Sequence, residues 1–549
     1  MIKYLKKHWW DVILVCALIL GFVFGILGFV KTDETNHKLG NALYESFRLF
    51  DLKYASKDIS PNLISAQWFL FFALLWLSLK VIITIIAPDL LSNIRVLLFY
   101  RKHIVICGLS KTTSNLVNEY KGKKIIILAE ECNKYSESLK QKGVKLFFCG
   151  NSFDEHFLQL AKIRVASQLF VVTDDDKKNV EITKLAFSLL KKASGNHALK
   201  CYTMIKDREL QNLLEESSLF KYRTETFDST LFNVNETGIK YGLSLNIEKI
   251  LPEKTVSPPE ILMVGLSEKS EIILLNLAHC LTMNREVFHF TIVESDTEKI
   301  TLFEKKYPYL QDFVKMEYAN DLEKTCKNKQ FTSIFVCLEN QIDAVKAAVS
   351  IRYTIAAYSP NIFIFSGQSE DLVSVMNIED DRITTLKDRN IFMLNTFEET
   401  IQYIVKLDSE IETLAEAAHN HFRKKDDQGN FLDNDEYSAL SSHFKQTNRN
   451  QVLDFYILTY MATGEKFSIK EVQPVAFSKY DKETLAMMEH RRWMIEKYDN
   501  GWVYGERNNQ FKRQDCLIEW ERLPENQQSK DFDVIDLMMD MLKNLINNY

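Results

Sequence analysis

The chain has 549 residues, of which 46% are hydrophobic and 26% charged, and its formal net charge at pH 7 is −6. This length exceeds what one hydrophobic core organises, so we expect three to four domains. The slightly acidic balance argues against a nucleic-acid partner, because a phosphate backbone is bound by a basic face.

Two apolar segments near the N-terminus predict membrane-spanning helices. Residues 12–30 are 19 residues without a charge, close to the length that crosses a hydrocarbon core of about 30 Å. The competing interpretation, a signal peptide, has a shorter apolar part. Residues 65–87 form the second segment, with the single charge Lys80. Lys80 either snorkels towards the end of its helix or faces a pore or a neighbouring helix.

The flanking charges predict the orientation of these segments. Three basic residues precede the first segment and three follow the second, namely Lys3, Lys6, Lys7, Arg95, Arg101 and Lys102. The positive-inside rule therefore places both termini in the cytoplasm, with two spans in an inner or plasma membrane. Residues 1–102 form this membrane unit and its linker.

The loop between the two spans contains a further helical pattern at Asn41–Leu52. This helix either lies on the outer membrane surface or dips back as a pore helix. The chain after it reads KYASKDISPN and lacks a T-V-G-Y-G-like run of carbonyl donors. Potassium selectivity of the usual kind is therefore not supported.

Residues 103–250 alternate apolar strand-like runs with helical segments, which predicts a parallel, doubly wound Rossmann-type sheet. The first strand ends at Gly108, and the second ends at Glu130, 22 residues later. In this fold, ligands bind at the carboxyl ends of the strands, and an acidic residue at about this spacing suits a ribose hydroxyl.

Four features in order resemble the TrkA-N/RCK family, the regulator-of-conductance domains of cation channels and transporters. They are Gly108, Glu130, G-N-S at 150–152 in place of the family's G-D-A, and T-D-D-D-x-x-N at 173–179. The resemblance covers residues 103–245 and implies a nucleotide site. The residues it implies are Gly108, Ser110, Thr113, Glu130, Gly150, Asn151, Thr173, Asp174, Asp175 and Asn179.

The glycine turn departs from the family pattern. Where the family has G-x-G-x-x-G, this chain places side chains at Ser110 and Thr113, which crowd the approach of a pyrophosphate. Two interpretations follow: a site for NAD or a different nucleotide, or a structural remnant.

Residues 258–405 carry a second copy around Gly265, with C-L-E-N instead of the T-D-D-D-x-x-N element. We expect this degenerate Rossmann domain to pack mainly against the first.

Residues 408–549 are expected to form a mainly α-helical domain. The pattern L-A-x-x-x-H-x-x-W at 485–493 and G-W-x-Y-G at 501–505 resembles a ryanodine-receptor (RyR) repeat. Its aromatic and basic side chains offer flat faces and charge to a nucleotide. The candidate ligand-binding residues are His490, Trp493, Trp502, Tyr504, Lys512 and Trp520. The alternative interpretation is that Trp493 and Trp502 fill the core and that His490 is buried and hydrogen-bonded.

No Ser-His-Asp set, paired carboxylates or metal-ligand spacing stands out, so we expect no catalytic residue and no metal site. The nine cysteines form no C-x-x-C pair, and neither a zinc site nor a disulfide framework is predicted.

Together, the motifs predict an oligomeric membrane channel, with four subunits as in the resembling family. Its partners are the lipid bilayer and a small nucleotide-derived ligand of the NAD, ADP-ribose or cyclic-nucleotide class. Three alternatives stay open: an antiviral effector that depolarises the membrane, a membrane-tethered NAD-binding enzyme, and a non-conducting scaffold. The sequence does not identify the ion, the ligand or the trigger.

Overall fold

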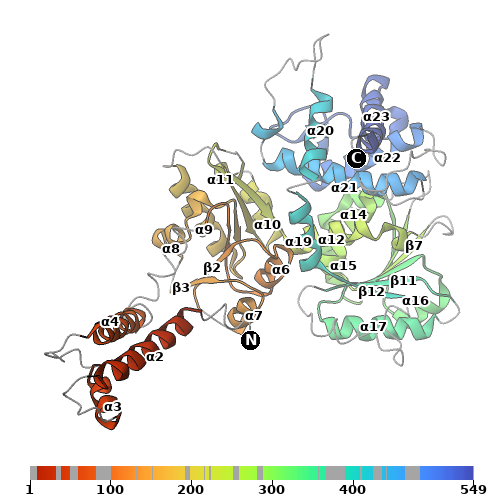
Figure 1. The fold of residues 1–549 in the computed structure, drawn as a ribbon. Coiled ribbons are helices and arrows are strands. Elements are labelled where there is room, and N and C mark those ends of the chain that lie inside the picture. The colour runs from red at the N-terminus through yellow and green to blue at the C-terminus, as the bar shows by residue number, and fades with distance from the viewer. Residues whose placement is uncertain are drawn as a thin grey trace. The chain divides into compact units, whose positions relative to one another are not determined.

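The computed structural model divides the chain into two compact units, Met1–Tyr100 and Arg101–Tyr549 (Figure 1). The structure describes residues 9–31, 39–49, 60–81, 100–131, 134–150, 153–191, 198–215, 217–221, 224–251, 259–280, 288–355, 358–366, 390–407, 411–423, 436–440, 442–463 and 482–547. The predicted linker 88–102 lies mostly outside these residues, as do residues 82–87 of the second apolar segment.

The described residues of the first unit form three helices, α2 (Trp9–Phe29), α3 (Leu39–Arg48) and α4 (Pro61–Val81). Glycines on one face of α2 allow close packing, because a Cβ at Gly21 would lie 2.9 Å from Leu70 Cγ and one at Gly28 would lie 2.7 Å from Leu63 Cγ. Residue numbers increase along α2 as those of their contacts in α4 decrease, so the two helices form an antiparallel hairpin.

Large apolar side chains cover the outside of this hairpin. Val15, Ile19, Val23 and Leu27 of α2 are 44–56% exposed, and the outward residues of α4 are similarly exposed. Among the described residues, α4 is long and apolar enough to cross a membrane, whereas the apolar stretch found in α2, Leu14–Phe29, is shorter. Lys80 lies in the last turn of α4.

The second unit contains two six-stranded sheets, and all strand pairs within each are parallel. The first sheet comprises β1 (Ile104–Cys107), β2 (Ile125–Ala129), β3 (Leu146–Cys149), β4 (Gln168–Val171), β5 (Leu199–Met204) and β6 (Phe227–Phe232). Its strand order is β3-β2-β1-β4-β5-β6. The fully buried strands β1, β2 and β4 are near-continuous apolar runs, as sheets covered on both faces require.

The helical segments of this part of the chain are α6 (Lys111–Glu119), α7 (Lys134–Gln141), α8 (Glu155–Leu160), η4 (Ile163–Val165), α9 (Asp176–Lys191), α10 (Arg208–Glu215), α11 (Ser218–Lys221), α12 (Val234–Leu245) and α13 (Ile247–Ile250). Strand order and crossovers confirm the predicted doubly wound fold.

The second sheet comprises β7 (Glu260–Val264), β8 (His289–Val293), β9 (Lys315–Ala319), β10 (Ser333–Val336), β11 (Asn361–Ser366) and β12 (Ile391–Asn395). Its order is β12-β11-β10-β7-β8-β9. Read from the β9 edge, this is the order of the first sheet, with β7 to β12 in the places of β1 to β6. The helical segments are α14 (Glu268–Cys280), α15 (Thr297–Lys306), η5 (Pro308–Asp312), α16 (Leu322–Asn328), α17 (Gln341–Thr354) and α19 (Thr396–Lys406). The predicted second Rossmann-type domain is thus confirmed.

The last helices of the two Rossmann domains are exchanged between them. Helix α12 of the first domain packs on α14 of the second, while α19 of the second domain packs on α6 of the first. The two exchanged helices also pack on each other, where Thr400 Oγ1 donates to the Val234 carbonyl over 2.9 Å. This reciprocal packing joins the two domains through one hydrophobic core.

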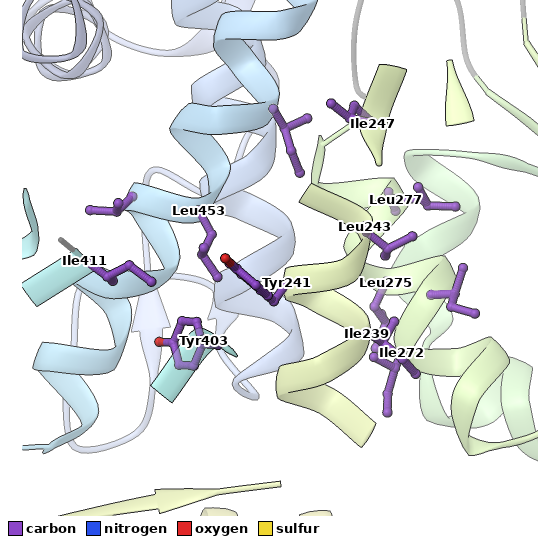
Figure 2. Close-up of a cluster of buried hydrophobic side chains, with 14 of the residues drawn as sticks. Ile239, Tyr241, Leu243, Ile247, Ile272, Leu275, Leu277, Tyr403, Ile411 and Leu453 are labelled. Carbon is purple, nitrogen blue, oxygen red and sulfur yellow. The ribbon is translucent and has the colours of Figure 1, made fainter. Parts of the chain in front are cut away.

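Both sides of α12 are buried in this core. Figure 2 shows Tyr241 pointing towards Tyr403 and Leu453, while Ile239 and Leu243 point to the opposite side, towards α14. The rings of Tyr241 and Tyr403 meet edge to face with centroids 5.9 Å apart.

The C-terminal part of this unit is mainly helical, as expected. Its elements are α20 (Glu412–Phe422), η8 (Tyr437–Ala439), α21 (Ser442–Thr463), α22 (Lys482–Asp499), β13 (Val503–Tyr504), β14 (Arg513–Gln514), η9 (Trp520–Arg522) and α23 (Glu525–Asn547). Helix α21 packs on both α12 and α14, and α22 packs on α14.

One cysteine departs from the expectation of free thiols: Cys149, at the exposed end of β3, is disulfide-bonded. Cys107, Cys201, Cys326 and Cys337 are free and buried. Burial raises the pKa of the Cys326 thiol to about 11, because the thiolate would lose its hydration.

The exchanged helices require a glycine where they cross. A Cβ at Gly238 of α12 would lie 2.1 Å from the backbone oxygen of Thr396. We therefore expect Gly238→Ala to lower the free energy of unfolding by at least about 1–3 kcal/mol, measured by thermal unfolding of the purified protein.

A second glycine of the same helix provides the control. A Cβ at Gly242 would make only ordinary contacts, the nearest at 3.5 Å, so Gly242→Ala should preserve stability or raise it by about 0.5–1 kcal/mol. Equal stability of the two variants would contradict the close packing of α12 on α19.

Candidate functional site at the first glycine turn

Gly108 brings the carboxyl ends of β1 and β4 into close contact. Its φ of +117° lies in a region that other residues rarely adopt, and a Cβ would lie 2.7 Å from the carbonyl oxygen of Val172. The lone glycine of the motif is therefore required by the turn itself, with or without a ligand.

Ser110 and Thr113 replace the missing glycines in different ways. The backbone N–H of Ser110 donates to Thr113 Oγ1 over 3.3 Å, and this hydroxyl donates to the Gly108 carbonyl over 3.0 Å. Thr113 is fully buried and thus closes the turn internally. Ser110, by contrast, is the N-cap of α6: its buried Oγ faces the Thr113 N–H in a capping box and donates no hydrogen bond. A rotation of this side chain would present its hydroxyl to a ligand at the N-terminus of α6.

Glu130 lies at the carboxyl end of β2 and forms an ion pair across the crevice. Lys178 Nζ, from the first turn of α9, donates to Glu130 Oε2 over 2.8 Å and to Oε1 over 3.0 Å. Because β1 lies between β2 and β4, this pair passes over the end of β1, where Gly108 stands. The hydrogen bond to Glu130 raises the pKa of Lys178. Both side chains are about 40% exposed, so solvent screens the pair.

The T-D-D-D-x-x-N residues mainly hold the loop between β4 and α9. The fully buried Asn179 side chain accepts from Thr173 N over 3.0 Å and from Thr173 Oγ1 over 2.6 Å. It donates to the carbonyls of Thr173 and Met204 over 3.0 and 2.9 Å. Thr173 and Asn179 thus form hydrogen bonds with each other rather than facing the crevice.

The acidic residues of this motif also have partners within the protein. Asp175 Oδ1 caps α9 by accepting from Lys178 N over 3.1 Å, and Asp174 pairs with Lys206 at 3.0 Å. Gly150 donates its N–H to the Ala129 carbonyl over 3.1 Å, while Asn151 lies outside the described residues. Gly108, Ser110 and Glu130 are therefore the predicted residues that the structure brings to the crevice, and Lys178 is the one that sequence reasoning missed.

The second glycine turn contains its own anion. Gly265 again has a positive φ, +89°, but the N–H of Leu266 donates to Glu294 Oε2 over 3.0 Å. Glu294 Oε1 accepts from the N–H groups of Ser295 and Asp296 over 2.9 and 3.0 Å. A carboxylate therefore lies where a Rossmann turn presents N–H groups to a phosphate. Partial burial raises the pKa of Glu294, but these three N–H donors outweigh it and lower the pKa.

The six candidate residues of the RyR-like pattern fall into a buried group and a group nearer the surface. His490 is 2% exposed, with Nε2 2.9 Å from the Ile518 carbonyl and Nδ1 3.3 Å from Asp531 Oδ2. Trp520 is also buried and packs near the His490 ring, with centroids 5.9 Å apart. His490 and Trp520 are thus core residues in this structure, because their rings fill the space between α22 and α23.

The other four RyR-like candidates lie nearer the surface. Trp493 and Trp502 are half-buried, and both contact Lys497, whose Nζ lies 5.8 and 4.7 Å from their ring centroids. Tyr504 is exposed, and Lys512 Nζ donates to the Asn500 carbonyl over 3.2 Å. Because His490 and Trp520 are buried and the other four candidates lie nearer the surface, the six residues do not line one site. Among the described residues, we find no cluster of three or more His, Cys, Asp or Glu residues that could hold a metal ion.

Comparisons with known domains agree with the motifs. Residues 104–219 match the family described as TrkA-N domain, and residues 475–548 match the family described as RyR domain. Two segments of the chain are thus similar to known families, one to the TrkA-N domain and one to the RyR domain. A comparison with curated protein sequences finds no match.

Several solved structures show distant similarity. The structure of GsuK bound to ADP is 12% identical, with a TM-score of 0.37, over 74% of this chain and 99% of the other. The GsuK channel bound to NAD is 11% identical, with a TM-score of 0.37, over 74% of this chain and 83% of the other. A dipicolinate synthase chain from Bacillus halodurans is 11% identical, with a TM-score of 0.21, over 56% of this chain and 98% of the other.

The internal carboxylate of the second turn leads to a pH prediction. The folded pKa of Glu294 lies below the ordinary value of 4.5, so its stabilising effect is present above that pH and is lost as the pH falls further. Glu294→Gln should therefore be less stable than the parent protein at neutral pH, and the difference should shrink between about pH 5 and pH 3. Thermal unfolding across this range measures it, and a pH-independent difference would show that ionisation is irrelevant.

Proposed function

We propose that the chain is the subunit of an oligomeric, non-catalytic membrane channel that a nucleotide-derived ligand gates through the cytoplasmic body. One observation carries the proposal: the same chain joins a TrkA-N domain to a helical hairpin whose large apolar side chains are exposed. A regulatory nucleotide fold attached to a lipid-facing hairpin suits ligand-controlled transport better than chemistry.

The exposed apolar surface supports the membrane assignment. On α4, the residues Trp68, Phe72 and Leu75 are 52–57% exposed, and on α3 the rings of Tyr44 and Phe47 are 63–66% exposed. Contiguous apolar surface of this extent is unfavourable in water but matches lipid. Both α2 and α4 contain 21 residues, about the length of a bilayer-spanning helix. We propose two spans with both termini in the cytoplasm, as the flanking basic residues predict.

The hairpin also supports an oligomer. Two helices cannot enclose a pore alone, so conduction requires several copies, and the resembling family favours four. In the first unit, Phe22 of α2 contacts Phe47 of α3 with ring centroids 4.7 Å apart. This helix between the two spans packs onto α2, an arrangement that favours the pore-helix interpretation of residues 41–52.

The first crevice offers chemistry for the ligand. It combines the Ser110 hydroxyl at a helix N-terminus, which suits a phosphate oxygen, with Glu130, which suits ribose hydroxyls. NAD, ADP-ribose and cyclic nucleotides share these groups. The second crevice is filled by Glu294, so the proposal assigns sensing to the first domain. A ligand gates only through its different affinity for the closed and open states.

Lys178 should compete with the ligand for Glu130. We predict that Lys178→Gln strengthens ADP binding about two- to fivefold, because an exposed ion pair contributes up to about 1 kcal/mol. Isothermal titration calorimetry of the full chain in nanodiscs measures the change. Lys177→Gln is the matched control, since Lys177 is the adjacent residue, more exposed, and pairs with Glu181 at 4.0 Å. Weaker binding in Lys178→Gln would instead show that the ammonium binds the ligand.

Ion flux from liposomes that carry the full chain tests the proposed function. Flux should appear with a nucleotide from the set ADP, NAD, ADP-ribose and cyclic nucleotides. Ser110→Trp should abolish it, because the indole would fill the crevice without straining Gly108. Ser138→Trp, on the exposed face of α7, should leave flux unchanged. Absence of flux with every ligand, despite assembled oligomers, would reject the channel and favour a tethered enzyme or scaffold.

A further inference from the structure

A cavity of about 580 Å³ lies within the second unit, away from the first glycine turn. Its wall includes α10 and α12 of the first Rossmann domain, α14 and η5 of the second, and α21 and α22 of the C-terminal part. This volume falls in the range of small-molecule sites, and a junction between domains is a common place for one. None of the motifs found in the sequence accounts for it.

The wall of this junction cavity is acidic. It contains nine carboxylate side chains and five basic ones. The basic groups are also largely engaged: Arg208 lies 3.0 Å from Asp499, Lys306 lies 2.9 Å from Glu271, and Arg492 lies 2.8 Å from Glu496. Lys240 and Lys206 pair with Asp454 and Asp174 in the same way. The excess negative charge disfavours a phosphate-bearing ligand in this cavity.

One buried hydrogen-bond acceptor in the wall lacks a donor. Gln211 is only 9% exposed, and its Oε1 has no hydrogen-bond partner, while its Nε2 donates to Glu215 Oε1 over 3.1 Å. A buried acceptor without a donor is unfavourable by about 1–3 kcal/mol, and a rotation of this side chain towards the N–H group of a bound ligand would relieve that cost. Glu215 and Glu268, on α10 and α14, also line the cavity, and burial raises the pKa of both.

We propose that the junction cavity binds an extended organic cation of the linear polyamine class. Its carboxylates come from separate elements, and no cluster among the described residues suits a metal ion, so several spaced ammonium groups match the wall better than one compact charge. Tyr307, Tyr309 and Tyr498 also line the cavity and add aromatic surface against which the methylene chain can pack. Such a ligand would bridge both Rossmann domains and the C-terminal helices, and so stabilise one arrangement of the body.

Calorimetric titration with spermine tests this site on the full chain in neutral phosphatidylcholine nanodiscs, which do not attract the polycation. We expect saturable binding that the double variant Glu215→Gln, Glu268→Gln weakens about tenfold or more, because the two carboxyl groups that a bound cation would hold in the ionised form are lost. The matched control is Glu137→Gln, Glu181→Gln, which neutralises two exposed carboxylates outside the cavity and should retain the parent affinity.

Two outcomes would overturn the proposal: no saturable binding to the parent protein, or equal affinity in both double variants. Thermal unfolding of the cavity variant without ligand shows whether it is folded. If it is not, Gln211→Glu in the otherwise unchanged chain supplies the second test, since an added carboxylate should strengthen spermine binding.

Discussion

The close crossing of α12 and α19 is the contact on which the rest of the second unit depends. Gly238 allows the backbone at Thr396 to approach so closely that even a methyl group would not fit. Around this crossing, each Rossmann domain contributes its last helix to the other, and α21 packs on the exchanged helix α12. The two sheets, the C-terminal helices and the junction cavity therefore share one core, and a change at any of these surfaces acts on the others through packed side chains.

The repeated domains use their equivalent turns differently. The first turn is closed by Thr113 but leaves the Ser110 hydroxyl without an acceptor, and its acidic residue is held by an exposed, weak ion pair that a ligand can displace. The second turn is satisfied by Glu294, a carboxylate of the protein itself. If the two domains arose by duplication and one turn was then filled by a carboxylate of the protein, one turn would be left for the proposed ligand and the other would be purely structural.

Periodicity and motif order predicted the two parallel sheets, the helical C-terminal part and both glycine turns, because these depend on local patterns. Other features depend on tertiary contacts that no local pattern encodes. Lys178 meets Glu130 from 48 positions away, and Asn179 turns inward to Thr173 although its motif suggested a ligand contact. The exchange of α12 and α19 and the burial of Trp520 likewise follow from packing between distant segments.

Hydrogen exchange of the full chain in nanodiscs, with and without nucleotide, tests the central claim that the first crevice is the sensing site. The account predicts slower exchange at residues 106–113 and 173–179 and no change at 263–270, where the Leu266 N–H already donates to Glu294 and the Ser267 N–H to Ser270. Protection confined to residues 263–270, or no protection at either turn with any nucleotide, would contradict it.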